Sequence, residues 1–208
     1  MFREVEVCEM KGLVLIAGLS KAGKSTFADN FCRSIPQSTH VPLDKYFKEV
    51  PQGLTFLRWV QSPDSIDWIL LREHIELLKS GHDCYTPVLD WRRTGRRVTR
   101  GGLKGHDASR IMTGGARYYV IPGCFAFKLP NPDAPVVRVY IDTPRSIIET
   151  RRQDLSCHDL VPPDGRESDI TEQIFDAHIV CTGTERHDND VKEIGERIVR
   201  ALEEQRMP

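Results

Sequence analysis

The sequence predicts an α/β domain in which a five-stranded parallel sheet carries helices on both faces. Three observations predict this class. Short apolar runs alternate with amphipathic stretches, the first apolar run ends in a glycine-rich turn, and 208 residues are enough for one domain with a substantial core. We therefore treat residues 1–208 as a single domain of ordinary globular composition, 39% hydrophobic and 28% charged.

The predicted strands are short apolar runs that end in glycine or polar residues. They cover residues 11–18, 39–47, 117–123, 136–142 and 177–183. The predicted helices cover residues 24–35, 62–81, 144–154 and 190–205. The first has apolar residues at helical spacing and ends before Pro36, the second begins at Ser62-Pro63-Asp64 and ends at Gly81, and the last is strongly amphipathic. Alternation of strands and helices predicts parallel pairing.

Two segments break this alternation. Residues 84–116 are rich in glycine and arginine and predict an irregular or hairpin insertion, and residues 155–168, with "PPDGRES", have the composition of a lid loop.

Composition excludes several classes of protein. No apolar run approaches the roughly 20 residues of a membrane helix, and the N-terminus lacks the apolar stretch of a signal peptide. The six cysteines form no C-x-x-C pair, so zinc and thioredoxin-like chemistry have no support in the sequence. Reduced thiols in a cytoplasmic protein are the simplest interpretation.

The net charge of −1 hides an uneven distribution. Between Arg92 and Arg117 there are eight Lys or Arg and one acid, Asp107, so this segment carries +7 and the remainder −8. Such a cluster binds something anionic or is a set of exposed arginines on a loop. A nucleic acid is disfavoured because no aromatic residues are interleaved for base stacking and the pI is about 6.7.

The stretch "GLSKAGKST", residues 18–26, matches G-x-x-x-x-G-K-[ST] between a predicted strand and a predicted helix. Glycines let the backbone N–H groups and the helix N-terminus face phosphate oxygens. Lys24 adds a positive charge, and the Ser25 hydroxyl is a magnesium ligand in such loops. We expect nucleotide phosphates to contact the residues of this loop: Gly18, Ser20, Lys21, Ala22, Gly23, Lys24, Ser25 and Thr26.

Asp44, in "PLDKYF", follows the second predicted strand. A phosphotransferase needs a carboxylate at this edge of the sheet to orient or deprotonate the attacking hydroxyl. Taken alone, Asp44 is better explained as the cap of the next turn.

Four motifs in register resemble the uridine kinase, pantothenate kinase and phosphoribulokinase family, which has the P-loop NTPase fold. They are "GLSKAGKST", "LDKYFK", "SPDSIDWILL" and "GHDCYTPVLDW", and the similarity continues through "VRVYIDTP" to Arg151-Arg152. The resemblance spans most of the chain. It implies a substrate-side hairpin within residues 84–116 and a lid over 155–168.

The resemblance also implies roles for individual residues. Asp44 matches the catalytic aspartate and, with Ser25, the magnesium site, whereas Asp67 and Trp68 belong to the fold. Arg151 and Arg152 match cations at the base of the lid that neutralise the transferring phosphoryl group, the alternative being a solvated helix face. The acceptor would meet the following residues: Asp44, Tyr46, Asp90, Trp91 and Arg96.

Three departures bear on function. The family's third strand ends in a glutamate that helps to hold magnesium, where this chain has Pro122. The Tyr and His that contact the pyrimidine nucleoside in uridine kinases are Leu89 and Thr94 here, so an acceptor other than uridine or cytidine is expected. The lid lacks a further "R-D" pair, and Arg166 is the candidate substitute.

These observations predict a kinase that uses ATP and Mg²⁺ to phosphorylate a hydroxyl of a small nucleoside-like or sugar-like acceptor. An acceptor that already carries a phosphate or carboxylate would suit the basic segment. The alternative, motivated by Pro122, is a nucleotide-binding regulatory protein with lost or reduced activity. A GTPase switch is disfavoured because N-K-x-D is absent. Relatives often self-associate, so a homo-oligomer is a further hypothesis.

Overall fold

The computed structural model describes residues 9–90, 96–98, 111–130, 132–153, 170–183 and 188–207. Five parallel strands form the central sheet in the order β2-β7-β1-β8-β9. Their bounds are β1 Gly12–Ala17, β2 Ser38–His40, β7 Tyr118–Pro122, β8 Val136–Asp142 and β9 Ile179–Thr182. The predicted five-stranded parallel sheet is confirmed.

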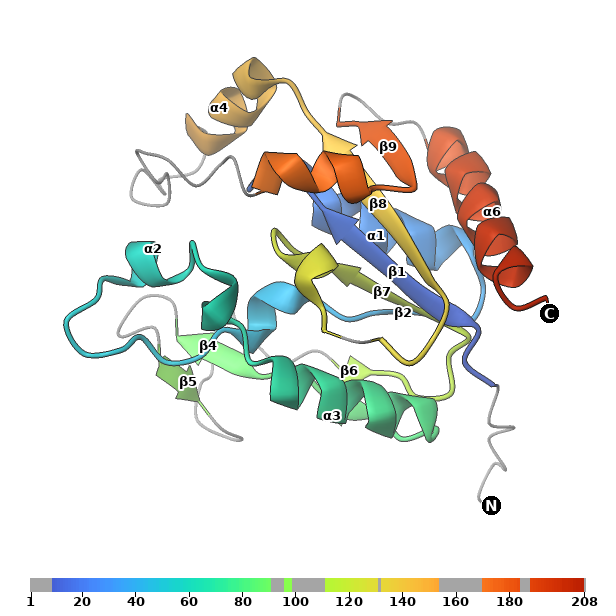
Figure 1. Cartoon of the computed structure of the whole chain (residues 1–208), viewed down its shortest axis with the longest axis horizontal. Coiled ribbons are helices and arrows are strands. Elements are labelled where there is room, and N and C mark those ends of the chain that lie inside the picture. The colour runs from blue at the N-terminus through green and yellow to red at the C-terminus, as the bar shows by residue number, and fades with distance from the viewer. Residues whose placement is uncertain are drawn as a thin grey trace.

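Helices cover both faces of the sheet (Figure 1). The helices are α1 Lys24–Ser34, α2 Phe56–Trp59, α3 Trp68–Lys79, α4 Arg145–Gln153 and α6 Asp188–Glu204. The 3₁₀ turns are η1 Leu43–Tyr46, η2 Pro63–Ser65, η3 Ala126–Lys128 and η5 Glu172–Asp176. The predicted helices at 24–35, 144–154 and 190–205 therefore agree with α1, α4 and α6 to within a few residues.

Strand β1 is buried along its whole length because it supplies side chains to two cores. Val14 and Ile16 pack against α1 and α6, whereas Leu13 and Leu15 pack under η1, α3 and η3. Alternate residues of a strand face opposite sides of the sheet, so an uninterrupted apolar run is required where both faces are covered. Each fully buried aliphatic side chain stabilises the fold by roughly 1.5–3 kcal/mol.

The second strand is shorter than predicted. It ends at His40, and residues 43–46 form a 3₁₀ turn rather than more strand. Pro122 explains the early end. Its missing N–H lies on the β2 side of β7, because the neighbouring Gly123 N–H donates to Ile16 on the β1 side (3.0 Å), so β7 offers β2 no further donor after the Val120 carbonyl accepts from Val41.

The helix predicted from residue 62 begins later than expected. Ser62-Pro63-Asp64 opens only the turn η2, and α3 begins at Trp68 with Asp67 as its N-cap (Asp67 carboxylate to Leu70 N–H, 3.0 Å). The helix does not extend back to residue 62 because contacts with a distant segment of the chain hold residues 66 and 67. The Asp67 N–H donates to the Tyr46 carbonyl at 2.7 Å, and Ile66 bridges to Phe47, so this segment pairs with the chain after η1 instead of continuing a helix.

The insertion contains two short antiparallel pairs. Strand β3 (Cys84–Tyr85) pairs with β6 (Ile111–Met112), and β4 (Val88–Asp90) pairs with β5 (Arg96–Val98). The hairpin expected within 84–116 is therefore present at its described residues. The predicted lid loop, 155–168, lies outside the described residues.

Candidate nucleotide and acceptor site

Residues 18–26, which we call the phosphate loop, connect β1 to the first turn of α1. Glycine is required at two of these positions, for different reasons. Gly18 has φ +141°, and a Cβ there would lie 2.6 Å from the Ile141 carbonyl oxygen of β8. Gly23 has φ +97° and immediately precedes α1. Both conformations disfavour other residues. The loop therefore delivers its backbone to the N-terminus of α1, where unsatisfied N–H groups and the helix dipole attract anions.

Lys24 is the first residue of α1 and is 8% exposed. Its ammonium group donates to the Leu19 carbonyl at 2.7 Å and contacts the Cys124 sulfur at 3.5 Å. The charge is thus held between the loop and the end of β7. Ser25 and Thr26 follow in the first helical turn and are exposed, as is Ser20 in the loop, so their hydroxyls are accessible from solvent.

Asp44 lies in η1 at the same edge of the sheet. Its side chain reaches solvent but is surrounded by enough protein that desolvation raises its pKa. The positive charges of Lys24, Lys45, His40 and Lys21 act in the opposite direction, Lys24 most strongly. The predicted base and the phosphate loop are therefore close enough to interact electrostatically, although Asp44 sits in a turn and not at the end of a strand.

Arg151 of α4 contacts the phosphate loop from the other side. Its Nη1 donates to the Lys21 carbonyl at 3.2 Å and its Nη2 to the Gly183 carbonyl at 3.1 Å. The structure thus places this guanidinium beside the loop and not on a solvated helix face. Arg152 is the next residue of α4, but its side chain lies outside the described residues, as does all of Arg166.

Tyr46 does not lie where an acceptor-binding residue should. It is fully buried in the core under the sheet, and its hydroxyl contacts His74 Nδ1 at 2.8 Å and Met112 Sδ at 3.8 Å. The 3₁₀ turn points Tyr46 inward while leaving Asp44 exposed. Its predicted contact with an acceptor therefore has no support in the structure.

The other predicted acceptor residues lie on the β4–β5 hairpin. Asp90 and Arg96 are register partners at the end of the pair next to the connecting residues 91–95, so their backbones are adjacent. Trp91 and most of the basic segment from Arg92 lie outside the described residues.

Two further positions at this edge of the sheet, Pro122 and Asp142, bear on whether the site could hold magnesium. Pro122 is buried at the end of β7, where a glutamate is expected, and it offers no ligand. Asp142 ends β8 with an exposed side chain, and its carbonyl accepts from Gly183 N–H at 2.6 Å. In the described part of the chain, no three His, Cys, Asp or Glu side chains gather as a metal site. A magnesium ion held by Ser25, Asp44, water and phosphate oxygens needs no such group.

Three residues near the loop escaped the sequence analysis. Thr143 donates to the Ala22 carbonyl at 2.8 Å, Cys124 contacts Lys24, and buried Gln173 donates from Nε2 to the Cys124 carbonyl at 2.8 Å. Knowledge of the strand order, which puts β7 and β8 on either side of β1, was needed to find Thr143 and Cys124.

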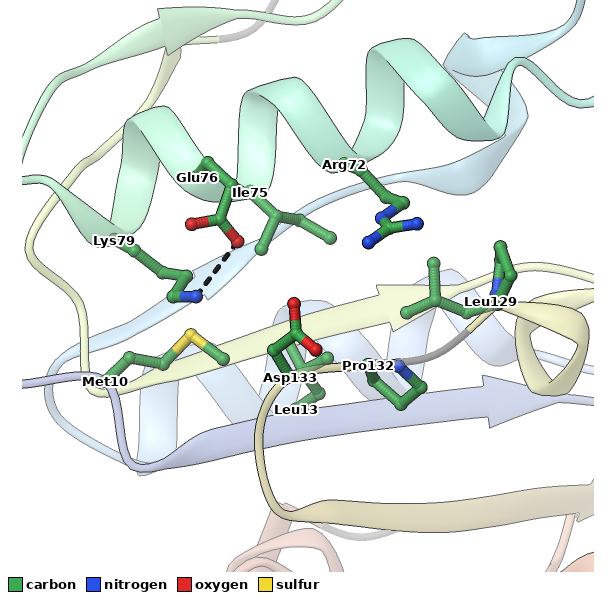
Figure 2. A pocket seen from close by; sticks show the side chains of 10 residues that line it. Met10, Leu13, Arg72, Ile75, Glu76, Lys79, Leu129, Pro132 and Asp133 are labelled. Carbon is green, nitrogen blue, oxygen red and sulfur yellow. Dashed lines mark hydrogen bonds and ion pairs between the residues drawn. The ribbon is translucent and has the colours of Figure 1, made fainter.

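A shallow pocket lies elsewhere, between α3 and the beginning of β1 (Figure 2). Its lining is part apolar and part charged: the apolar residues are Met10, Leu13, Ile75, Leu129, Pro130 and Pro132, and the charged ones are Arg72, Glu76, Lys79 and Asp133. It contains none of the predicted site residues, since the phosphate loop follows the opposite end of β1. No helix in the described ranges is both long and apolar enough to cross a membrane.

The fold has known counterparts. The structure of a possible uridine kinase from Bacillus stearothermophilus superposes with a TM-score of 0.52 over 85% of this chain and 91% of that one, at 17% sequence identity. The fold is that of a P-loop kinase. No protein-family profile matches the chain.

Curated relatives match part of this chain. A uridine kinase of Halobacterium salinarum is 34% identical over 89 residues, which is 41% of this chain and 40% of the relative. A uridine kinase of Ureaplasma urealyticum serovar 10 is 33% identical over 86 residues, 38% of this chain and 42% of the relative. The matches therefore span less than half the length of these relatives. The resemblance to uridine kinases is confirmed over those segments, and beyond them the likeness is one of fold.

Proposed function

We propose that this protein is an ATP-dependent small-molecule kinase that transfers the γ-phosphoryl group to a hydroxyl of a nucleoside-like or sugar-like acceptor. The observation that carries the proposal is the placement of Asp44, in the turn η1 that follows β2, at the same edge of the sheet as the phosphate loop between β1 and α1, with Lys24 acting on its pKa. A base without a phosphate loop, or a loop without a base, would not suffice for this reaction.

Each residue of the loop has a distinct task in this proposal. The N–H groups at the start of α1 and the Lys24 ammonium bind the β- and γ-phosphates of ATP. Lys24 must leave the Leu19 carbonyl to do so, and a phosphate oxygen is the stronger, charged acceptor. Arg151 retains N–H groups beyond its two hydrogen bonds to carbonyls, and these face the developing negative charge.

Asp44 handles the proton. Its carboxylate accepts the proton of the acceptor hydroxyl as the acceptor oxygen bonds to phosphorus, and the bond from phosphorus to the bridging oxygen of ADP breaks with its electron pair leaving on ADP. Mg²⁺, which Ser25 and Asp44 would help to hold, neutralises phosphate charge when bound. Catalysis then rests on positioning and charge neutralisation, which is typical of phosphoryl transfer.

The acceptor is proposed only as a class. The chain lacks the Tyr and His pair that accompanies uridine recognition, and Asp90 and Arg96 lie together on the hairpin. An acceptor that is already anionic, such as a sugar phosphate, fits the basic segment that begins at Arg92. Action in the cytoplasm and assembly into a homo-oligomer remain predictions.

A second function, nucleotide binding without transfer, is favoured by Pro122, since proline cannot ligate magnesium or its water. Calorimetry of ADP–Mg²⁺ and ATP–Mg²⁺ binding, together with ADP release over a panel of nucleosides, sugars, sugar phosphates, vitamins and alcohol-bearing antibiotics, separates the two. Turnover with one acceptor supports the kinase. Tight ATP binding without turnover on the whole panel supports the regulatory protein, and no binding of either nucleotide contradicts both.

A further inference from the structure

Two backbone carbonyl groups of the phosphate loop accept hydrogen bonds from side chains of residues that follow β8. The Thr143 hydroxyl donates to the Ala22 carbonyl at 2.8 Å, and Arg151 Nη1 donates to the Lys21 carbonyl at 3.2 Å. Thr143 lies between β8 and α4 and is 5% exposed, and Arg151 lies within α4. These two hydrogen bonds therefore hold the loop through its backbone carbonyls and not through its side chains.

The Thr143 hydrogen bond has a geometric consequence for the nucleotide. In a trans peptide the N–H of the next residue points opposite to the carbonyl. Holding the Ala22 carbonyl toward Thr143 therefore turns the N–H of Gly23, the N-cap residue of α1, away from Thr143. Gly23 has φ +97°, and glycine can adopt many other conformations. An interaction that fixes the orientation of the Ala22–Gly23 peptide is therefore needed.

Gly183 completes the arrangement after β9. Its carbonyl accepts from Arg151 Nη2, and its N–H donates to the Asp142 carbonyl. A Cβ at this position would overlap the Thr143 hydroxyl and would lie 2.9 Å from the Ala22 carbonyl oxygen. The backbone of Gly183 is thus packed against the hydrogen bond between the Thr143 hydroxyl and the Ala22 carbonyl.

We propose that Thr143 is a positioning residue that, through the Ala22 carbonyl, aims the Gly23 N–H at a nucleotide phosphate, and that Gly183 keeps the Thr143 hydroxyl in place. This inference rests on the proposed nucleotide binding but not on transfer to an acceptor. It assigns a binding contribution to a residue that touches no substrate.

The test compares Thr143→Val, which removes only the hydroxyl, with Thr143→Ser, which keeps it. Thr39→Val is the matched control, because Thr39 is also buried and its hydroxyl donates to the carbonyl of Thr113, outside the phosphate loop. ADP–Mg²⁺ affinity is measured by calorimetry, and backbone amide exchange is followed over the phosphate loop. We expect Thr143→Val to weaken ADP binding about tenfold, the effect of losing one well-placed hydrogen bond, and to speed exchange at the loop amides.

Thr143→Ser and Thr39→Val should bind ADP within about twofold of the wild type, a difference of a few tenths of a kcal/mol. Gly183→Ala is the second variant. It keeps the hydroxyl but displaces it, and the Gly183 φ is one that alanine adopts, so it should reproduce the loss of affinity even if Thr143→Val fails to fold. Where an acceptor is known, KM for ATP should rise more than kcat falls.

Folded Thr143→Val or Gly183→Ala protein that binds ADP as the wild type does would overturn the inference. A wild type that binds ADP but phosphorylates no acceptor contradicts the proposed kinase and leaves this result standing. A wild type that binds no nucleotide overturns both.

Discussion

The phosphate loop and the acceptor side of this molecule are held by different kinds of interaction. The loop is fixed by hydrogen bonds to its carbonyl groups from Thr143, which follows β8, and from Arg151 of α4. On the acceptor side, Asp44 is exposed in a turn, and the β4–β5 hairpin is joined to the domain by the short pair β3–β6. In Figure 1, α4 and this hairpin lie on opposite sides of the central strands.

The difference concerns what each side has to recognise. A triphosphate is the same in every reaction, so a rigid backbone cradle serves it, and rigidity lowers the entropic cost of binding. An acceptor differs from enzyme to enzyme, and its contacts come from an insertion that can change without disturbing the sheet. In the resemblance drawn from the sequence, the motif at the loop matches the uridine kinase pattern, whereas Leu89 and Thr94 depart from it.

The largest effect that would test this comparison is expected for Asp44→Asn. Loss of the base should lower kcat by roughly 10²–10⁴-fold, whereas the affinity for ADP without Mg²⁺ should be unchanged or slightly tighter because a negative charge near Lys24 is removed. Steady-state kinetics with an identified acceptor and calorimetry with ADP measure the two quantities. Asp64→Asn, in the exposed turn η2, is the control and should retain full activity. Full activity of Asp44→Asn would show that another group takes the proton.

The next effect in size is expected for Arg151→Lys. A lysine cannot span the Lys21 and Gly183 carbonyls as the forked guanidinium does, although its charge is the same. We expect kcat/KM for ATP to fall about tenfold, comparable to the loss of one charged hydrogen bond. Arg145→Lys, on the exposed start of α4, is the control and should change kcat/KM by less than about twofold. Equal effects of the two variants would mean that Arg151 contributes charge alone.

What the sequence could predict follows the same division. Gly18, Gly23, Lys24 and Ser25 act through local backbone geometry, so their spacing alone located the loop and the helix after it. The alternation of apolar runs likewise located all five strands of the sheet. Asp67 and Trp68 were correctly assigned to the fold, since Asp67 caps α3 and Trp68 Nε1 donates to the Pro63 carbonyl at 3.0 Å.

What it could not predict depends on contacts between distant segments. Residues 66 and 67 have the pattern of a helix, yet they lie outside α3 because Ile66 is extended and bridges to Phe47, and the Asp67 N–H donates to the Tyr46 carbonyl. Tyr46 was expected at the acceptor, but the turn η1, which forms because β2 ends early, directs it into the core. Thr143 gave no signal, because its partner Ala22 is 121 residues away in the chain.

A smaller effect concerns pH and sharpens the role of Asp44. Because desolvation raises its pKa in the folded state, the protonated carboxyl is favoured by the fold. Its contribution to stability is therefore present below the pKa of the unfolded chain and is lost as the pH rises through the folded pKa. Asp44→Asn should then have a higher melting temperature than the wild type near neutral pH, and the gap should close in acid.

The raised pKa of Asp44 also sets the pH below which kcat falls, because Asp44 can accept a proton only when its carboxyl group is ionised. Lys24 is the largest of the charges that oppose the shift, so Lys24→Ala should raise the pKa of Asp44 further and move the acid limb of its residual kcat to higher pH. Melting curves by circular dichroism and pH–rate profiles measure these effects. An acid limb at the same pH in Lys24→Ala would contradict the electrostatic coupling between the two sides.

The smallest effect is expected for Tyr46→Phe, and it separates a core residue from an acceptor ligand. The Tyr46 hydroxyl lies 2.8 Å from His74 Nδ1, and the two rings meet edge to face at 5.5 Å. Removing the hydroxyl leaves the aromatic packing in place but takes one hydrogen bond from the core. We expect the free energy of unfolding to fall by about 1 kcal/mol and KM for the acceptor to stay within about twofold.

Urea denaturation and acceptor titrations measure the two quantities, with exposed Tyr85→Phe as the control that should change neither. If Tyr46→Phe instead raised KM for the acceptor several-fold at unchanged stability, the hydroxyl would have to turn from His74 toward the acceptor in the working enzyme. Because Tyr46 and Asp44 share the turn η1, such a result would mean that this turn rearranges on binding, whereas the phosphate loop is already fastened by its neighbours before any ligand arrives.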